Sequence, residues 1–82
     1  MHKKISEKVI NRLTLYHCIL TDYIDQNIEY ISSKQLASLL KIDDSQVRKD
    51  ISVLSNSGKS NVGYIVKEMK NSIEKTLGFA KN

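Results

Sequence analysis

The sequence contains no proline, no tryptophan and a single cysteine, and each shortage excludes a class of structure or site. Cys18 has no second cysteine with which to form a disulfide or a thiolate zinc site within one chain. We also find no low-complexity tract, no internal repeat and no linker. We therefore expect one small domain, residues 1–82, with too little core to enclose a large substrate pocket.

Long apolar runs and catalytic groupings are missing as well. The opening stretch MHKKIS is too short and too polar for an export signal, so we expect a cytoplasmic protein with no membrane partner. His2 and His17 have no partner at a spacing that would build a nucleophile or a metal site. Cys18 is expected to be a small buried or half-buried apolar residue. The sequence therefore predicts no enzyme, no catalytic residue and no metal ligand.

Positive charge is in excess and is unevenly distributed. The chain carries 13 lysines and arginines against 9 acidic residues, a net charge of +4 with an isoelectric point near 9.3. Residues 1–12 and residues 45–67 each hold four basic side chains against one acidic one, whereas residues 13–44 are net acidic. Two basic blocks favour an anionic partner, although solvated surface lysines are the alternative explanation.

Apolar spacing along the chain predicts mostly helical structure. Ser6 can cap a long first helix that ends near Asn27, and one apolar face recurs along it at spacings of three and four. Its members are Val9, Leu13, Tyr16, Leu20, Tyr23 and Ile24. Glu29–Ser32 fits a short edge strand. A last helix follows Val66, Met69, Ile73 and Leu77 and ends at Gly78.

The segment SSKQLASLLKIDDSQVRKDIS, residues 32–52, predicts two helices joined by a tight turn. Ser32 with Gln35, and Asp43 with Gln46, each have the spacing of a capping box. The first helix is expected to bury Leu36, Leu39 and Leu40. The second, about residues 44–54, places Val47, Ile51 and Leu54 on one face and Ser45, Arg48, Lys49 and Ser52 on the other. This layout is typical of a DNA-binding helix-turn-helix, although structural helical hairpins show similar capping.

Residues 55–66, SNSGKSNVGYIV, predict a β-hairpin. Gly58 and Gly63 flank a polar tip of Lys59, Ser60 and Asn61, and Val62, Tyr64 and Val66 alternate along the outgoing strand. A hairpin after a recognition-type helix is the wing of a winged helix, and Lys59 could reach a phosphate or the minor groove. A glycine-containing loop with a solvated lysine is the simpler alternative. The predicted fold is mostly α with a small β-hairpin, a winged helix-turn-helix.

The segments ISEKVINRL, residues 32–52 and GKSNVGY occur in the order and spacing of a known bacterial family. The chain resembles the N-terminal DNA-binding domain of the Rex family, redox-sensing transcriptional repressors, from about Lys4 to Phe79. The resemblance implies binding to an inverted-repeat operator as part of a homodimer. It also implies a following Rossmann domain, expected after residue 82 in a full-length relative, that senses NADH against NAD⁺. No GxGxxG occurs here, so we expect no cofactor in this chain. The resemblance places the dimer contacts mainly in the following domain, so it also implies that the isolated domain is monomeric.

The resemblance also implies roles for individual residues. Arg48 and Lys49 match the recognition-helix pair, Lys59 the wing lysine, and Arg12 a basic position that can touch the DNA backbone. Tyr64 matches the tyrosine at the base of the wing, whereas Ser60 and Asn61 stand where the family commonly has arginine and glycine. The candidate DNA-binding residues are Arg12, Ser45, Gln46, Arg48, Lys49, Ser52, Lys59, Ser60, Asn61 and Tyr64. The alternative function is a winged helix that contacts another protein rather than DNA.

Overall fold

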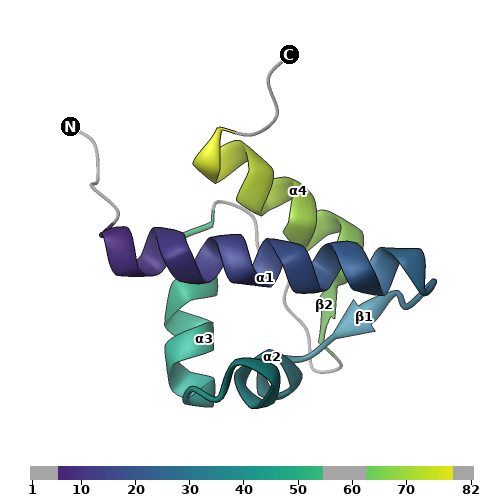
Figure 1. Cartoon of the computed structure of the whole chain (residues 1–82), viewed down its shortest axis with the longest axis horizontal. Coiled ribbons are helices and arrows are strands. Elements are labelled where there is room, and N and C mark those ends of the chain that lie inside the picture. Colours follow the sequence, from purple (N-terminus) through teal and green to yellow (C-terminus); the bar gives the residue numbers. More distant parts are fainter. Residues whose placement is uncertain (1–5, 55–62, 79–82) are drawn as a thin grey trace.

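The computed structural model describes residues 6–54 and 63–78, which form four helices and two short strands. In chain order these are α1 (Glu7–Asp25), β1 (Tyr30–Ile31), α2 (Ser33–Leu40), α3 (Asp44–Ser52), β2 (Tyr64–Ile65) and α4 (Val66–Leu77). The long helix α1 runs across the molecule, with α4 on one side and the α2–α3 pair on the other (Figure 1). The mostly helical fold is as predicted.

Local capping explains where most helices begin and end. The Ser6 hydroxyl accepts a hydrogen bond of 3.3 Å from the Val9 amide, and Ser32 and Gln35 form the predicted capping box. Gly78 ends α4 in the left-handed conformation, with φ 80°. The predicted box at Asp43 is wrong, because the Asp43 side chain makes no capping hydrogen bond. Helix α3 still begins after Asp43, so its start depends on packing rather than on a side-chain cap.

The turn between α2 and α3 is short and closely bonded. Lys41 adopts the left-handed conformation, with φ 60°, and the Ile42 amide donates to the Ala37 carbonyl at 3.0 Å. The Ser33 hydroxyl donates to the Asp44 carboxylate, which ties the first turns of the two helices together. These bonds hold α2 and α3 as the helical pair that the sequence predicted.

The two strands form an antiparallel pair that brings distant parts of the chain together. Tyr30 pairs with Ile65 and Ile31 with Tyr64, and the Val66 amide donates to the Glu29 carbonyl at 2.9 Å. The edge strand predicted at Glu29–Ser32 is thus confirmed in shortened form, whereas Val66 begins a helix instead of continuing a strand. The predicted wing tip and its incoming strand, within residues 55–62, lie outside the described residues.

Gly63 allows β2 to approach β1 closely. Its φ is 128°, a conformation that other residues rarely adopt, and an added Cβ would lie 2.9 Å from the Ile31 carbonyl oxygen. Any larger residue at this position would therefore push the two strands apart. The glycine predicted to flank the wing tip has this additional role at the sheet.

The core lies between α1, α4 and the α2–α3 pair. Its buried apolar residues are Leu13, Tyr16, Leu20, Ile31, Leu36, Ala37, Val47, Ile51, Leu54, Val66, Met69 and Ile73. The predicted apolar faces of α1, α3 and α4 are confirmed, and Leu40 packs partly buried against the core. Leu39 was expected to be buried but is 53% exposed, since Leu36, Ala37 and Leu40 form the inner face of α2.

Candidate nucleic-acid interface

The outer face of α3 carries the side chains predicted to meet DNA. Ser45, Arg48, Lys49 and Ser52 are exposed, whereas Val47 and Ile51 on the opposite face are buried. The separation follows from the helical repeat, which turns successive side chains by about 100°. Helix α3 packs against α2 and α1, and its exposed side chains lie on the opposite face (Figure 1).

Arg48 and Lys49 are available to bind an anion. Arg48 Nη2 lies 3.4 Å from Asp44 Oδ2, and its side chain is 59% exposed, so this pair is weak and easily exchanged for another partner. Lys49 is exposed on the next position of the same face. The Ser52 hydroxyl donates to the Lys49 carbonyl at 2.6 Å, which leaves its oxygen free only as an acceptor. The surface thus presents two cations beside short polar side chains.

Gln46 and Arg12 are directed toward the interior of the domain. Gln46 Nε2 donates to Asp50 Oδ1 at 3.0 Å, and Arg12 reaches the same carboxylate from α1. The Arg12 Nε to Asp50 Oδ2 distance is 2.6 Å and the Nη2 to Oδ1 distance is 3.1 Å, a bidentate pair. The Arg12 side chain is 24% exposed. DNA contacts by Arg12 and Gln46 stay predictions. Such contacts would use the N–H groups of these side chains that do not donate to Asp50.

Asp50 is the residue at this site that sequence reasoning missed. It is 1% exposed and accepts a fourth hydrogen bond from the Tyr16 hydroxyl, 2.6 Å from Oδ2. A sequence signal was available, because Asp50 falls in the apolar stripe of Val47, Ile51 and Leu54, where an acidic residue needs a partner. The sequence did not indicate which basic residue would supply it.

The surroundings of Asp50 shift two ionisation equilibria. Burial by itself would raise the pKa of Asp50, but the hydrogen bonds from Arg12 and two further side chains outweigh this effect and lower it. Burial, together with the hydrogen bond to Asp50, raises the pKa of Tyr16. The pair is therefore an ionised carboxylate with a neutral phenol across most of the pH range.

We expect Asp50 to make the domain sensitive to acid. Its folded-state pKa lies below the unfolded value of about 3.9, so its stabilising contribution is complete above that value. The contribution is lost as pH falls through the folded pKa. Urea unfolding measured between pH 7 and pH 2.5 should show this decline, and Asp50→Asn should flatten it. An unchanged acid limb in Asp50→Asn would contradict the assignment, and Asp25→Asn, at an exposed position, is the matched control.

The remaining predicted site residues contribute less to the described surface. Tyr64 lies half-buried in β2, paired with Ile31, at the base of the predicted wing. Lys59, Ser60 and Asn61 fall outside the described residues, so their roles stay predictions. Cys18 is exposed on α1, and the expectation that it would be buried or half-buried is wrong.

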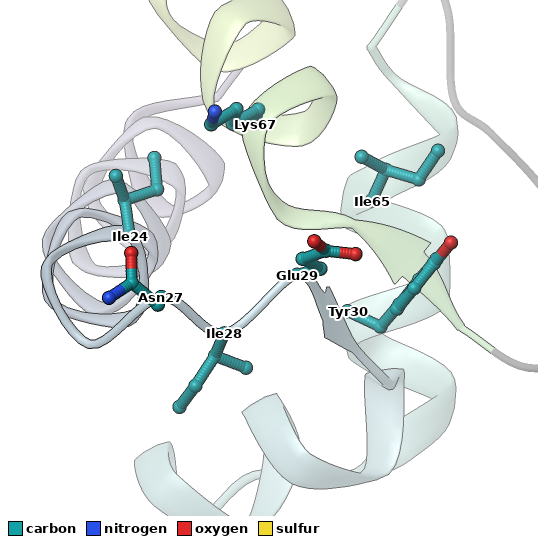
Figure 2. Close-up of a pocket in the computed structure, with 7 residues that line it drawn as sticks. All are labelled: Ile24, Asn27, Ile28, Glu29, Tyr30, Ile65 and Lys67. Carbon is teal, nitrogen blue, oxygen red and sulfur yellow. The ribbon is translucent and has the colours of Figure 1, made fainter.

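A cavity lies away from the face of α3, between the end of α1, the strand pair and the start of α4 (Figure 2). Ile24, Asn27, Ile28, Glu29, Tyr30, Ile65 and Lys67 line it. Its volume of about 290 Å³ is at the lower limit for pockets that hold small molecules. None of these residues belongs to the predicted DNA-binding set. The cavity is therefore separate from the basic face of α3, which is formed by Ser45, Arg48, Lys49 and Ser52.

A second polar cluster joins α1 to α4. Glu74 Oε2 lies 2.8 Å from His17 Nε2 and 2.5 Å from Lys70 Nζ, and these hydrogen bonds, that of His17 first, lower the pKa of Glu74. The His17 side chain is 20% exposed on α1. Within residues 6–54 and 63–78, no three His, Cys, Asp or Glu side chains gather to hold a metal ion. In the same residues, no helix has the length and apolar character needed to cross a membrane.

Comparison with known proteins gives consistent matches. The family model described as "Putative DNA-binding protein N-terminus" matches residues 4–52. Redox-sensing transcriptional repressor Rex of Thermosipho africanus is 43% identical over 81 residues, 99% of this chain and 39% of that protein. Rex of Clostridioides difficile is 39% identical over 77 residues, 94% of this chain and 37% of the relative. The chain thus spans about two fifths of the length of these relatives, both of which are redox-sensing transcriptional repressors.

Solved structures extend the comparison to the fold. RSP, a Rex-family repressor, superposes with a TM-score of 0.84 at 31% identity, over 99% of this chain and 36% of RSP. RSP in complex with β-NAD⁺ and operator DNA superposes with a TM-score of 0.83 at 32% identity, over 94% of this chain and 36% of that one. The predicted winged helix-turn-helix and the resemblance noted in the sequence are confirmed.

Proposed function

We infer that this chain, which belongs to the "Putative DNA-binding protein N-terminus" family, is the sequence-specific DNA-binding domain of a redox-sensing transcriptional repressor. The observation that carries this inference is the outer face of α3, where Arg48 and Lys49 are exposed on a helix supported by α2. A helix of this kind fits the major groove, in which base edges present distinct patterns of donors and acceptors. The similarity to a repressor solved with operator DNA supports the same function.

In this proposal Arg48 and Lys49 have the central role. Their side chains project from adjacent positions of α3, so one can reach a base edge while the other meets a phosphate. Ser45 and Ser52 are short and let the helix backbone approach the DNA closely. Lys59, with Ser60 and Asn61, adds a contact from the predicted wing, and Tyr64 supports its base.

The proposal extends to a longer protein of the same kind. An inverted-repeat operator would be bound by a homodimer, with one copy of this domain on each half-site. The relatives have a further three fifths of their length outside the matched region, which could form a second domain. That domain would bind NAD(H) and control DNA release, since the related repressor RSP was solved with β-NADH. The protein would act in the cytoplasm. The isolated domain would be monomeric and would bind a half-site without any response to nucleotide.

We expect Lys49→Ala to reduce sequence discrimination. Duplexes selected from a random-sequence library by this chain would be compared with scrambled duplexes of equal composition. If Lys49 reads a base, its loss should narrow the difference in binding free energy by about 1–3 kcal/mol. Fluorescence anisotropy titrations at one salt concentration would measure both duplexes.

Two lysine variants serve as controls for this experiment. Lys59→Ala should weaken both duplexes about equally, as expected for a phosphate contact. Lys67→Ala removes the same charge from α4, away from α3, and should have a smaller effect on either duplex. Equal losses on both duplexes for Lys49→Ala would reduce Lys49 to a phosphate contact. Failure of the parent chain to prefer the selected duplex would contradict the proposed function itself.

A further inference from the structure

The buried carboxylate of Asp50 joins the helix predicted to read DNA to the longest helix of the domain. Arg12 and Tyr16 reach it from α1, with three hydrogen bonds of 2.6 to 3.1 Å, and Gln46 reaches it from within α3. Asp50 is 1% exposed and Tyr16 is fully buried. We call these four residues, Arg12, Tyr16, Gln46 and Asp50, the carboxylate cluster.

We propose that the carboxylate cluster positions α3 for sequence recognition, by setting its rotation about its own axis relative to α1. This inference rests on the proposed function, because it assigns the cluster a role in placing Arg48 and Lys49. Asp50 directly follows these two residues in the sequence. Any rotation that moves the Asp50 carboxylate out of its hydrogen bonds moves both cations with it.

The apolar contacts of α3 are less able to set this rotation. Val47, Ile51 and Leu54 are buried in the core, but apolar contact is non-directional and tolerates small rotations. Hydrogen bonds weaken steeply when distance or angle departs from the optimum. A carboxylate that accepts bonds from three side chains on two helices therefore restricts the rotation more narrowly than the apolar face does.

The size of the effect follows from helix geometry. Side chains extend about 5 Å from the helix axis, so a rotation of roughly 20° displaces them by about 2 Å. Recognition groups need to be held within about 0.5 Å and 10–20° of their productive geometry. Loss of the cluster would thus disturb contacts with base edges, whereas flexible cations could still find phosphates.

Arg12 acquires a different role in this arrangement. Its Nε and Nη2 atoms bind Asp50, and its side chain is 24% exposed, so the guanidinium is immobilised against α3. A contact of Arg12 with the DNA backbone would then fix α1 and α3 together relative to the DNA, since this side chain connects both helices. The cluster links the backbone contact and the recognition helix in one rigid unit.

Tyr16→Phe is the sharpest test, because it removes one hydrogen bond and leaves every charge in place. Affinity for the selected duplex should fall roughly 3- to 30-fold, the range found for coupling mutations that do not touch the ligand. Affinity for the scrambled duplex should stay within about twofold. The dependence of affinity on salt should be unchanged, since the number of phosphate contacts is the same. Circular dichroism would establish that both proteins are folded at the titration temperature.

Asp50→Asn is the second variant and keeps the shape of the side chain. It raises the net charge by one, so Asp25→Asn, on the exposed face of α1, is the matched charge control. Relative to this control, Asp50→Asn should also lose affinity for the selected duplex more than for the scrambled one. If Asp50→Asn fails to fold, the Tyr16→Phe comparison decides the question alone.

Several results would overturn the proposal. Equal losses on both duplexes, or a lowered melting temperature with unchanged affinities of the folded protein, would show that the cluster acts only in stability. Failure of the parent chain to discriminate between the duplexes would instead reject the proposed function, and this outcome is visible before any variant is made. Loss of discrimination in Tyr16→Phe with retained scrambled-duplex binding supports the positioning role.

Discussion

Leu36→Ala is expected to lower the free energy of unfolding by about 2–5 kcal/mol, because it removes a fully buried side chain and leaves a cavity in the core. Leu39→Ala, on the same helix, should change it by no more than about 0.5 kcal/mol. Leu36 is 0% exposed and Leu39 is 53% exposed. The two substitutions are chemically identical, so the difference between them measures burial alone.

Urea unfolding followed by far-ultraviolet circular dichroism would give both values. A loss of 2–5 kcal/mol is a large part of the stability of a domain of this size, so Leu36→Ala should be studied at low temperature. Similar losses in the two variants would show that the inner face of α2 has been assigned wrongly. A large loss for Leu39→Ala with little loss for Leu36→Ala would contradict the structure and also the arrangement expected from the sequence, in which Leu36 is buried.

DNA binding is expected to weaken roughly 40- to 150-fold between 50 mM and 200 mM salt, if three or four phosphates are neutralised. Each such contact releases a condensed counterion, which contributes about −0.9 to the slope of log affinity against log salt. Exposed Arg48 and Lys49, the predicted wing residue Lys59 and Arg12 are the candidate cations. Anisotropy titrations of one duplex across this range would measure the slope.

Substitution of single lysines shows which side chains contribute to the slope of log affinity against log salt. Lys59→Ala should lower its magnitude by about 1, whereas Lys67→Ala, on α4, should leave it unchanged. Adding millimolar NADH should have no effect, because the cofactor is expected to bind a different domain. Absence of any salt-dependent binding would instead favour a surface that contacts protein. Release of DNA by NADH would place the sensing chemistry within these 82 residues.

Features that depend on neighbours in the sequence could be predicted well. Ser32 and Gln35 form their capping box because both partners belong to one helix turn and need nothing else. The two faces of α3 follow equally from the helical repeat, which separates Val47 and Ile51 from Arg48 and Lys49 whatever the helix packs against. Most of the exposed polar face of α3 could therefore be predicted from residues 43–52.

The spacing of residues within one segment was not enough to predict the hydrogen bonds of a side chain that has two possible partners. Asp43 and Gln46 have the same spacing as the confirmed capping box, but the Gln46 backbone amide donates to the Asp43 carbonyl at 3.0 Å and the Gln46 side chain donates to Asp50. A buried carboxylate without partners is costly, so its demand outweighs that of an exposed helix start. The helical repeat is also ambiguous at the edges of an apolar stripe, which is why Leu39 was expected to be buried with Leu40.

The sequence by itself determined the helices, the tight turn, the basic face of α3 and the family resemblance, because each is encoded in short stretches of chain. Only the tertiary structure decided that β2 pairs with β1 and that Arg12 binds Asp50, 38 positions away. Such contacts depend on how the whole core packs, and no spacing within one segment contains that information. The basic face is a local property of α3, whereas its orientation is a property of the folded domain.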